Sequence, residues 1–242
     1  MKRILAFAAL SSFLLCSCHF FHGKRIEGSG NVITQSRQVS GFSNIDVGGA
    51  ISVIITQASD YSVKVEVDDN LQEYIEVFKE GSTLRIRQQN NTSLETSNNK
   101  IKVYVSAPEF RKLHASGACD FKGENQLKGN YTMDIDLSGA SQAKLDIDAS
   151  KVEARLSGAG SLELDGQVNE LDIHGSGSSD IRCYDMIAQH VDIRISGSGS
   201  AEVFAGVSLK ADISGAGSVR YKGHPGEVKK SVSGAASVNP AD

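Results

Sequence analysis

The chain has 242 residues, with 25 Lys plus Arg against 29 Asp plus Glu and a formal net charge of −4 at pH 7. It contains 24 Gly, only 3 Pro and no Trp, which is typical of an all-β protein with many tight turns. The net charge is negative and no basic block occurs, so we expect no nucleic-acid partner.

Residues 1–17 are predicted to be a lipoprotein signal peptide. A short basic start precedes an apolar run, Ile4 to Leu15, that is shorter than the roughly 20 residues a membrane-spanning helix needs. The run ends in Leu15-Cys16-Ser17-Cys18, which resembles a bacterial lipobox with Cys18 as the acylated residue. An ordinary secretory signal is the alternative. Lipidation predicts that the protein is anchored in the cell envelope, at the outer membrane, with the surface or periplasmic side left open.

The mature chain is expected to comprise a tether, residues 18–27, and one solenoid domain, residues 28–242. Short alternating apolar runs before residue 105 follow no fixed period, so we expect less regular coils or a sandwich-like cap there. Within this half, Asn70 to Val77 is compatible with one or two helical turns. The polar stretch from Gln88 to Asn99 predicts an exposed loop.

A Ser-Gly dipeptide recurs seven times between about residues 108 and 238, with spacings of 22, 19, 19, 20, 18 and 19 residues. A period near 19 predicts stacked coils. Apolar residues alternate on both sides of each dipeptide, so each coil is expected to be a strand, a tight turn and a strand. The glycine permits the positive φ that such a turn needs. The expected turn glycines are Gly117, Gly139, Gly158, Gly177, Gly197, Gly215 and Gly234.

Counting each serine as offset zero, offsets −5, −3, −1, +5 and +7 are mostly apolar and are expected to face the core. Second turns are expected at Gly123, Gly166, Gly206 and Gly223. Two domain cysteines, Cys119 and Cys183, fall three coils apart, about 14 Å at the strand spacing, which is too far for a disulfide. In the last coil, Lys229 and Lys230 are expected to protect the open edge.

The outward columns contain candidate metal ligands. Offset −4 places carboxylates on consecutive coils, and Ca²⁺ prefers such oxygen ligands. The candidate ligands are Asp134, Asp136, Glu153 and Asp172. Because Arg155 and Arg194 stand beside this column, we favour a solvated face of alternating charge, with no metal or other cofactor. At offset +6 on the other sheet, alternating charge is explained by cross-strand pairing alone.

An enzyme of pectate-lyase-like shape is the rival interpretation, because Arg155 lies near Asp134 and Glu153 in register. The turns are short, so we expect little concave surface. No Ser/His/Asp set, Cys-x-x-Cys, His-Glu-x-x-His or phosphate loop is evident, and no base is offered to the repeated serines. We therefore expect no catalytic residues.

The order of several weak motifs resembles the putative auto-transporter adhesin family with a head GIN domain. These motifs are Gly30-Asn31-Val32, Phe42-x-x-Ile45-x-Val47-x-Gly49, Val63-x-Val65-x-Val67-Asp68-Asp69-Asn70-Leu71 and the Ser-Gly-Ala-Gly turns. The resemblance implies a right-handed parallel β-helix, or β-solenoid, in an exported and frequently lipidated protein of Gram-negative bacteria. It implies adhesion and supplies no binding residues. After Cys18 the sequence lacks the acidic run that can accompany surface export.

We therefore expect an anchored, non-catalytic adhesion or ligand-binding module. Its expected partners are the membrane through the lipid anchor, and glycans or surface proteins of the envelope or a host. A homo-oligomer and a purely structural envelope role are left open.

Overall fold

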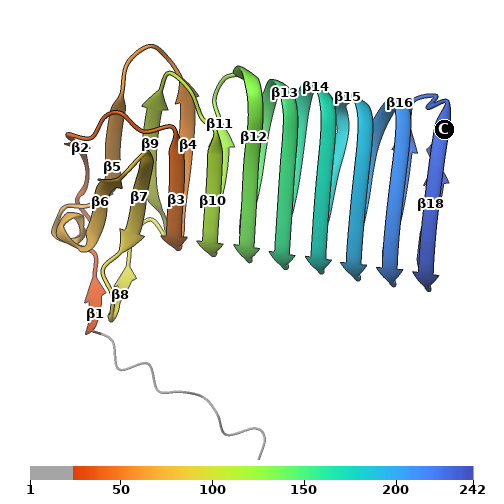
Figure 1. The fold of residues 1–242 in the computed structure, drawn as a ribbon. Coiled ribbons are helices and arrows are strands. Elements are labelled where there is room, and N and C mark those ends of the chain that lie inside the picture. The colour runs from red at the N-terminus through yellow and green to blue at the C-terminus, as the bar shows by residue number, and fades with distance from the viewer. Residues whose placement is uncertain (1–23, 242) are drawn as a thin grey trace, which may run out of the picture.

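The computed structural model describes residues 24–241 and is a right-handed parallel β-solenoid (Figure 1). Each long strand bends once, so that its two halves lie on opposite faces, and pairs in parallel with the strand of the next coil. These strands are β12 (Leu127–Gly139), β13 (Gln142–Gly158), β14 (Ser161–Gly177), β15 (Asp180–Gly197) and β16 (Ser200–Gly215). The predicted solenoid with coils of about 19 residues is confirmed.

The core consists of stacked apolar columns. Ala154, for example, is paired with Ile135 in the preceding coil and Ile173 in the next, and all three are fully buried. Because strand residues alternate between faces, the odd offsets around each serine point inward and the even offsets point outward. Cys119 and Cys183 are buried and form no disulfide within residues 24–241. Burial raises the pKa of the Cys183 thiol to about 12.

The stacking begins before the first Ser-Gly dipeptide. Strands β3 (Asn44–Gly49) and β4 (Ile51–Gln57) form a coil beneath β10 (Lys112–Gly117) and β11 (Asp120–Gly123). In this register Gly48 and Gly49 pair with Ser116 and Gly117, and φ of Gly49 is +106°. The Gly48-Gly49 pair is therefore an earlier member of the same column of turns, in which glycine replaces serine.

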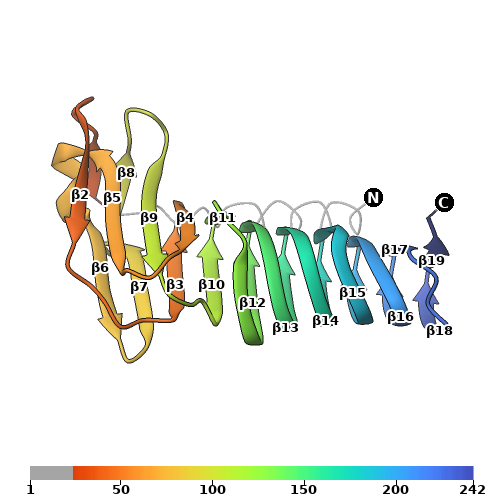
Figure 2. The ribbon, with the colours of Figure 1, turned by 90° about the horizontal axis from the view of Figure 1, so that it is seen from above.

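The segment between β4 and β10 folds back over the N-terminal end of the solenoid (Figure 2). Strands β7 (Thr83–Gln88) and β9 (Ile101–Ala107) extend the parallel stack, and antiparallel strands then cover it. The covering strands are β2 (Val32–Arg37), β5 (Ser62–Asp68) and β6 (Ile75–Glu80). We call this group the N-terminal cap.

A 3-10 helix, Asp69–Tyr74, joins β5 to β6 and confirms the expected helical turn. The expectation of a loop from Gln88 to Asn99 was wrong in part. Thr92–Glu95 forms β8, which pairs in parallel with β1 (Lys24–Glu27). A polar segment becomes a strand here because a distant strand supplies its hydrogen bonds, which no local pattern announces.

The C-terminal end is formed by β17 (Ser218–Lys222), β18 (Glu227–Gly234) and β19 (Ser237–Pro240), and no antiparallel layer covers it within residues 24–241. Lys230 stands opposite Ala211, in the inward column, and its Nζ donates a hydrogen bond to the Val238 carbonyl at 2.9 Å. An inward lysine prevents another strand from stacking on this edge.

The seven Ser-Gly glycines share one geometry, with φ between +79° and +116°. A Cβ on any of them would lie 2.4 to 2.5 Å from the carbonyl oxygen of the glycine one coil earlier. That same oxygen accepts a hydrogen bond of 2.7 to 2.8 Å from the residue after the glycine above it. Of the expected second-turn glycines, Gly166 and Gly223 have positive φ, whereas Gly123 and Gly206 do not.

Candidate ligand-binding groove

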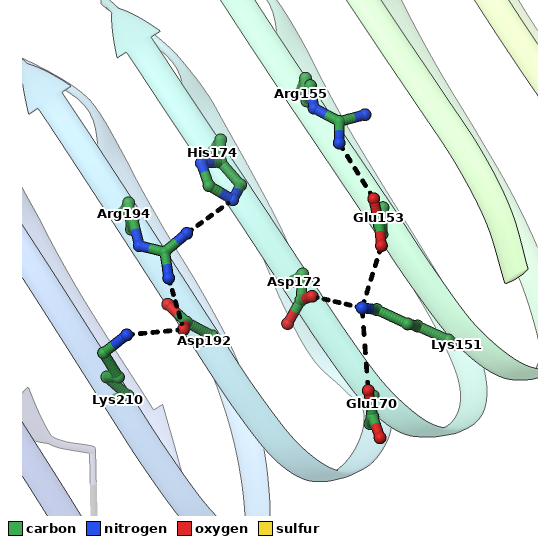
Figure 3. A network of polar contacts seen from close by, with 9 residues as sticks. All are labelled: Lys151, Glu153, Arg155, Glu170, Asp172, His174, Asp192, Arg194 and Lys210. Atoms are coloured by element: carbon green, nitrogen blue, oxygen red, sulfur yellow. Dashed lines mark hydrogen bonds and ion pairs between the residues drawn. The ribbon is translucent and has the colours of Figure 1, made fainter.

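The front face is the outer surface of β10, β12, β18 and the C-terminal parts of β13–β16, which faces the viewer in Figure 1. Lys151 of this face pairs with Glu153 at 2.9 Å and Asp172 at 2.7 Å, and lies 3.8 Å from Glu170 (Figure 3). These hydrogen bonds, first to Asp172 and then to Glu153, raise the pKa of Lys151 well above its usual range. The same contact with Lys151 lowers the pKa of Glu153.

Other carboxylates of the front face are paired in the same way. Asp136 lies 2.6 Å from Nζ of Lys112, and Asp192 accepts hydrogen bonds from Arg194 at 2.8 Å and Lys210 at 2.9 Å. Neighbouring coils thus neutralise one another's charges. Within the acidic column, Glu153, Asp172 and Asp192 thus form a ladder of ion pairs, whereas Asp134 has no ion pair within residues 24–241.

The four candidate cation ligands do not form one site. Glu153 and Asp172 share Lys151, while Asp136 pairs with Lys112 and lies 3.6 Å from Arg155. Over residues 24–241 no group of three or more His, Cys, Asp or Glu side chains is arranged to hold a metal ion. A cation would have to displace a lysine that is already in place.

A shallow groove of about 560 Å³ runs across the front face, along the solenoid axis. Offsets −2 and 0 form most of its lining, with backbone and apolar groups of offset −1 between them. The expectation of little concave surface was wrong, because concavity arises here without long loops: long side chains at offset −2 stand beside short serines at offset 0. The offset −2 residues are His114, Asp136, Arg155, His174, Arg194 and Asp212, and the serines are Ser138, Ser157, Ser176, Ser196 and Ser214.

Three nitrogen-bearing side chains occupy consecutive coils at the middle of the groove. Arg155 donates to Glu153 at 2.9 Å, and Arg194 donates to Asp192 at 2.8 Å and to Nε2 of His174 at 3.1 Å. Because Nε2 accepts this hydrogen bond, His174 carries its proton on Nδ1 in this arrangement. Arg194 is held by one carboxylate, whereas Arg155 also lies 3.6 Å from Asp136, and both guanidinium groups keep further N–H groups.

Two of the groove serines donate hydrogen bonds to the backbone of the preceding coil. Ser138 donates to the Ala115 carbonyl at 3.1 Å and Ser176 to the Leu156 carbonyl at 3.3 Å, each one coil earlier. None of the groove serines is hydrogen-bonded to a histidine within residues 24–241. Outside the groove, His190 Nδ1 and Ser208 Oγ lie 2.9 Å apart. Within residues 24–241 no acidic group is hydrogen-bonded to the His190 imidazole. The described residues thus show no serine whose histidine partner is oriented by an acidic group.

The opposite face of the coils also carries paired charges. Lys144 pairs with Glu163, and Arg182 pairs with Asp180 at 2.5 Å. The first pair joins neighbouring strands, as cross-strand pairing at offset +6 predicts, whereas the second lies within β15. The offset −2 residues can be identified from the sequence repeat, but the groove cannot. It depends on how far the side chains of neighbouring columns project from the sheet.

Comparisons with known proteins match both the sequence and the fold. The family model for the putative auto-transporter adhesin, head GIN domain, matches residues 41–225. A putative adhesin from Bacteroides fragilis is 24% identical, with 89% of this chain and 100% of that chain covered and a TM-score of 0.85. A putative lipid binding protein from Parabacteroides distasonis is 26% identical, with 90% and 100% covered and a TM-score of 0.75. No curated protein matches.

Proposed function

Since the chain belongs to the putative auto-transporter adhesin family with a head GIN domain, we propose that it is an exported, lipid-anchored module that binds a ligand at the cell envelope and carries out no catalysis. The family and the similar structures named as adhesins support a role of the adhesin type at the envelope. Within residues 24–241, no helix has the length and apolar character needed to cross a bilayer.

The proposed anchor is the acylated Cys18, at the outer membrane. It lies outside the described residues, six positions before β1 begins at Lys24. Six residues span at most about 20 Å, so an acylated Cys18 would keep the N-terminal cap close to the bilayer. The front face would then extend away from the cap along the solenoid axis.

Labelling cells with a fatty-acid analogue tests the anchor. The wild-type protein and Cys16→Ala are expected to incorporate the label and to sediment with the outer membrane. Cys18→Ala is expected to lose both properties. Incorporation that depends on Cys16 instead would contradict the assignment, and so would label-free sedimentation.

The observation that carries the binding role is the groove across the front face. It exposes guanidinium, imidazole, carboxylate and hydroxyl groups in one line over several coils. These groups form hydrogen bonds with polar ligands, whereas the described residues assemble no nucleophile, base and metal together. A protein that acts only as a spacer needs no groove on its surface. A flat face of ion pairs would be enough for that role.

Screening the soluble Cys18→Ala protein against immobilised glycans and lipids tests this role. We expect saturable binding that is reduced by Arg194→Gln and retained by Arg182→Gln on the opposite face. If the folded, monodisperse protein binds none of the glycans, lipids or envelope extracts, the structural role is favoured. Shortening of a polysaccharide during the incubation would favour the lyase alternative.

A further inference from the structure

The geometry points to a specific class of ligand for the groove: an extended glycan in which one carboxylate-bearing sugar is flanked on both sides by neutral sugars. This inference rests on the proposed binding function and names its chemistry. The carboxylate is placed at the middle of the groove, against Arg155, His174 and Arg194. Neutral sugars are placed toward both ends.

The middle of the groove is the part that offers donors. Arg155, His174 and Arg194 follow one another on β13, β14 and β15, in direct register, and Figure 3 shows them side by side. At a spacing of about 4.8 Å per coil, the two arginines lie roughly 10 Å apart with the imidazole between them. A carboxylate above His174 is thus within reach of donors from both sides, and charge-assisted hydrogen bonds to guanidinium are the strong ones.

Existing partners of the arginines orient these donors and limit the charge they attract. Glu153 holds Arg155, and Asp192 holds Arg194, each through one Nη2 atom. The other terminal nitrogens also have neighbours, since Arg155 Nη1 lies 3.6 Å from Asp136 and Arg194 Nη1 donates to His174 Nε2, so the guanidinium planes are fixed. The arginine side chains are still 52% and 44% exposed, which leaves them accessible to a ligand. Because each arginine is already half neutralised, the centre suits a single carboxylate better than a dense polyanion.

The ends of the groove carry the opposite charge. Asp136 and Asp212 lie beyond Arg155 and Arg194, one coil out on each side. Asp136 is paired with Lys112 at 2.6 Å, whereas Asp212 is exposed and has no ion-pair partner within residues 24–241. A second anionic group two coils from the centre, about 10 Å away, would meet one of these carboxylates. Sugar hydroxyls, by contrast, donate readily to aspartate.

The serine column explains why the ligand is an extended, hydroxyl-rich chain. From His114 to Asp212 the groove crosses five coil steps, which is about 24 Å at the strand spacing. Ser138 and Ser176 donate to the backbone and present their remaining lone pairs outward. A row of acceptors with one repeat per coil matches donors that recur along a chain, as hydroxyls do along a glycan.

The test uses the soluble Cys18→Ala protein and a hexasaccharide of neutral sugars with a single glucuronate near its middle. Its carboxyl-reduced form is the neutral probe, and an oligomer of uronate alone is the densely charged probe. Calorimetry is expected to show the singly charged hexasaccharide binding at least tenfold more tightly than either of the others. Arg155→Gln and Arg194→Gln are each expected to weaken it by about tenfold or more, since each removes a hydrogen bond to a charged group.

Arg182→Gln and Arg220→Gln, on the opposite face, are the matched controls and are expected to leave the affinity unchanged. An Asp212→Asn variant is expected to narrow the preference against the uronate oligomer, which a nonspecific basic surface would not show. The four arginines substituted in this test are at the surface, so we expect each variant to fold. Melting temperatures check this expectation.

Three results would overturn the inference while leaving a binding function in place. The first is equal binding of the acidic and reduced hexasaccharides. The second is tighter binding of the uronate oligomer. The third is binding of any ligand that survives both groove arginine substitutions. Silence toward these probes, with binding to another ligand in the wider screen, also overturns it, whereas silence throughout overturns the proposed function itself.

Discussion

The N-terminal cap and the repeated coils solve the same problem with different means. In the coils, stability comes from identical positions stacked in register, such as the Ser-Gly glycines and the buried columns at odd offsets. In the cap, single buried polar residues form hydrogen bonds that have no counterpart in a repeated column. Asp68, fully buried, accepts backbone hydrogen bonds from Gly30 and Ser97, and Gln72 donates to the carbonyls of Ile33 and Val65.

The difference follows from what each part must accomplish. A coil covers its neighbour with a copy of itself, so one solution repeats. The cap ends the stack, and antiparallel strands that have no equivalent below must be connected to it. Buried polar groups with defined partners fix such unique connections. The following substitutions separate the two modes of stabilisation.

Gly177→Ala is expected to give the largest loss of stability. Its φ is +93°, and the added Cβ would lie 2.5 Å from the Gly158 carbonyl, which accepts the hydrogen bond of Ser178 at 2.8 Å. Left-handed strain and the displaced hydrogen bond together should cost about 3 kcal/mol or more. Chemical denaturation measures this loss.

Gly30→Ala in the N-terminal region is the matched control for Gly177→Ala. Gly30 has φ of +86°, but an added Cβ would meet nothing within 4 Å. Its cost should be limited to left-handed strain, about 1 to 2 kcal/mol. If the two alanines cost the same, close stacking is not the reason for the repeated glycines.

Asp68→Asn is expected to weaken the cap by about 1.5 to 3 kcal/mol at neutral pH, because two backbone N–H groups lose a charged acceptor. Burial alone would raise the pKa of Asp68, but the hydrogen bonds from Ser97 and Gly30 lower it overall. Its contribution is therefore present above about pH 4 and is lost as the pH falls through the lowered folded-state pKa.

Hydrogen exchange in the cap, measured across this pH range, checks the prediction for Asp68. The wild-type cap should lose protection on acidification, and the asparagine variant should lose less. Unchanged exchange in Asp68→Asn at pH 7, or an equal pH response in both proteins, would contradict it.

The sequence predicts the two regions unequally, for the same physical reason. The coils can be predicted from the sequence because Ser-Gly recurs at a nearly fixed spacing, once in each coil. Gly48-Gly49 belongs to the same column but lacks the serine, so the first coil is visible only in the register of β3 with β10. Strand β8 exists only because β1 pairs with it. The groove depends on side-chain heights in neighbouring columns, and a linear pattern does not contain them.

Lys230→Val tests how the open end is protected. The lysine occupies an inward position beside Val228 and Val232, which are 37% and 45% exposed, and its ammonium lies 5.4 Å from the Tyr221 ring centre. Valine would make the last coil resemble an internal one. We expect little change in unfolding free energy, within about 1 kcal/mol, but concentration-dependent association through the unpaired β18 edge.

Analytical ultracentrifugation measures this association, and Lys229→Val, at the outward position next in sequence, serves as the control. A monomeric Lys230→Val protein would show that the edge is protected by other means. Association of both variants alike would indicate general surface hydrophobicity instead of an opened core column.

Lys151→Gln is expected to have the smallest effect on stability and the most specific effect on ion binding. The side chains are half-buried but still reach solvent, at 26 to 30% exposure, so we expect the ion pairs with Glu153 and Asp172 to stabilise the fold by about 1 kcal/mol. Removing the ammonium leaves these two carboxylates and Glu170 facing one another, which favours a hard cation with oxygen ligands. Calcium should therefore raise the melting temperature of Lys151→Gln but not that of the wild type or of Lys144→Gln on the opposite face. A calcium-dependent rise in the wild type would instead mean that the ladder of ion pairs yields to the ion, and that the front face differs from the cap in binding cations as well as in its regularity.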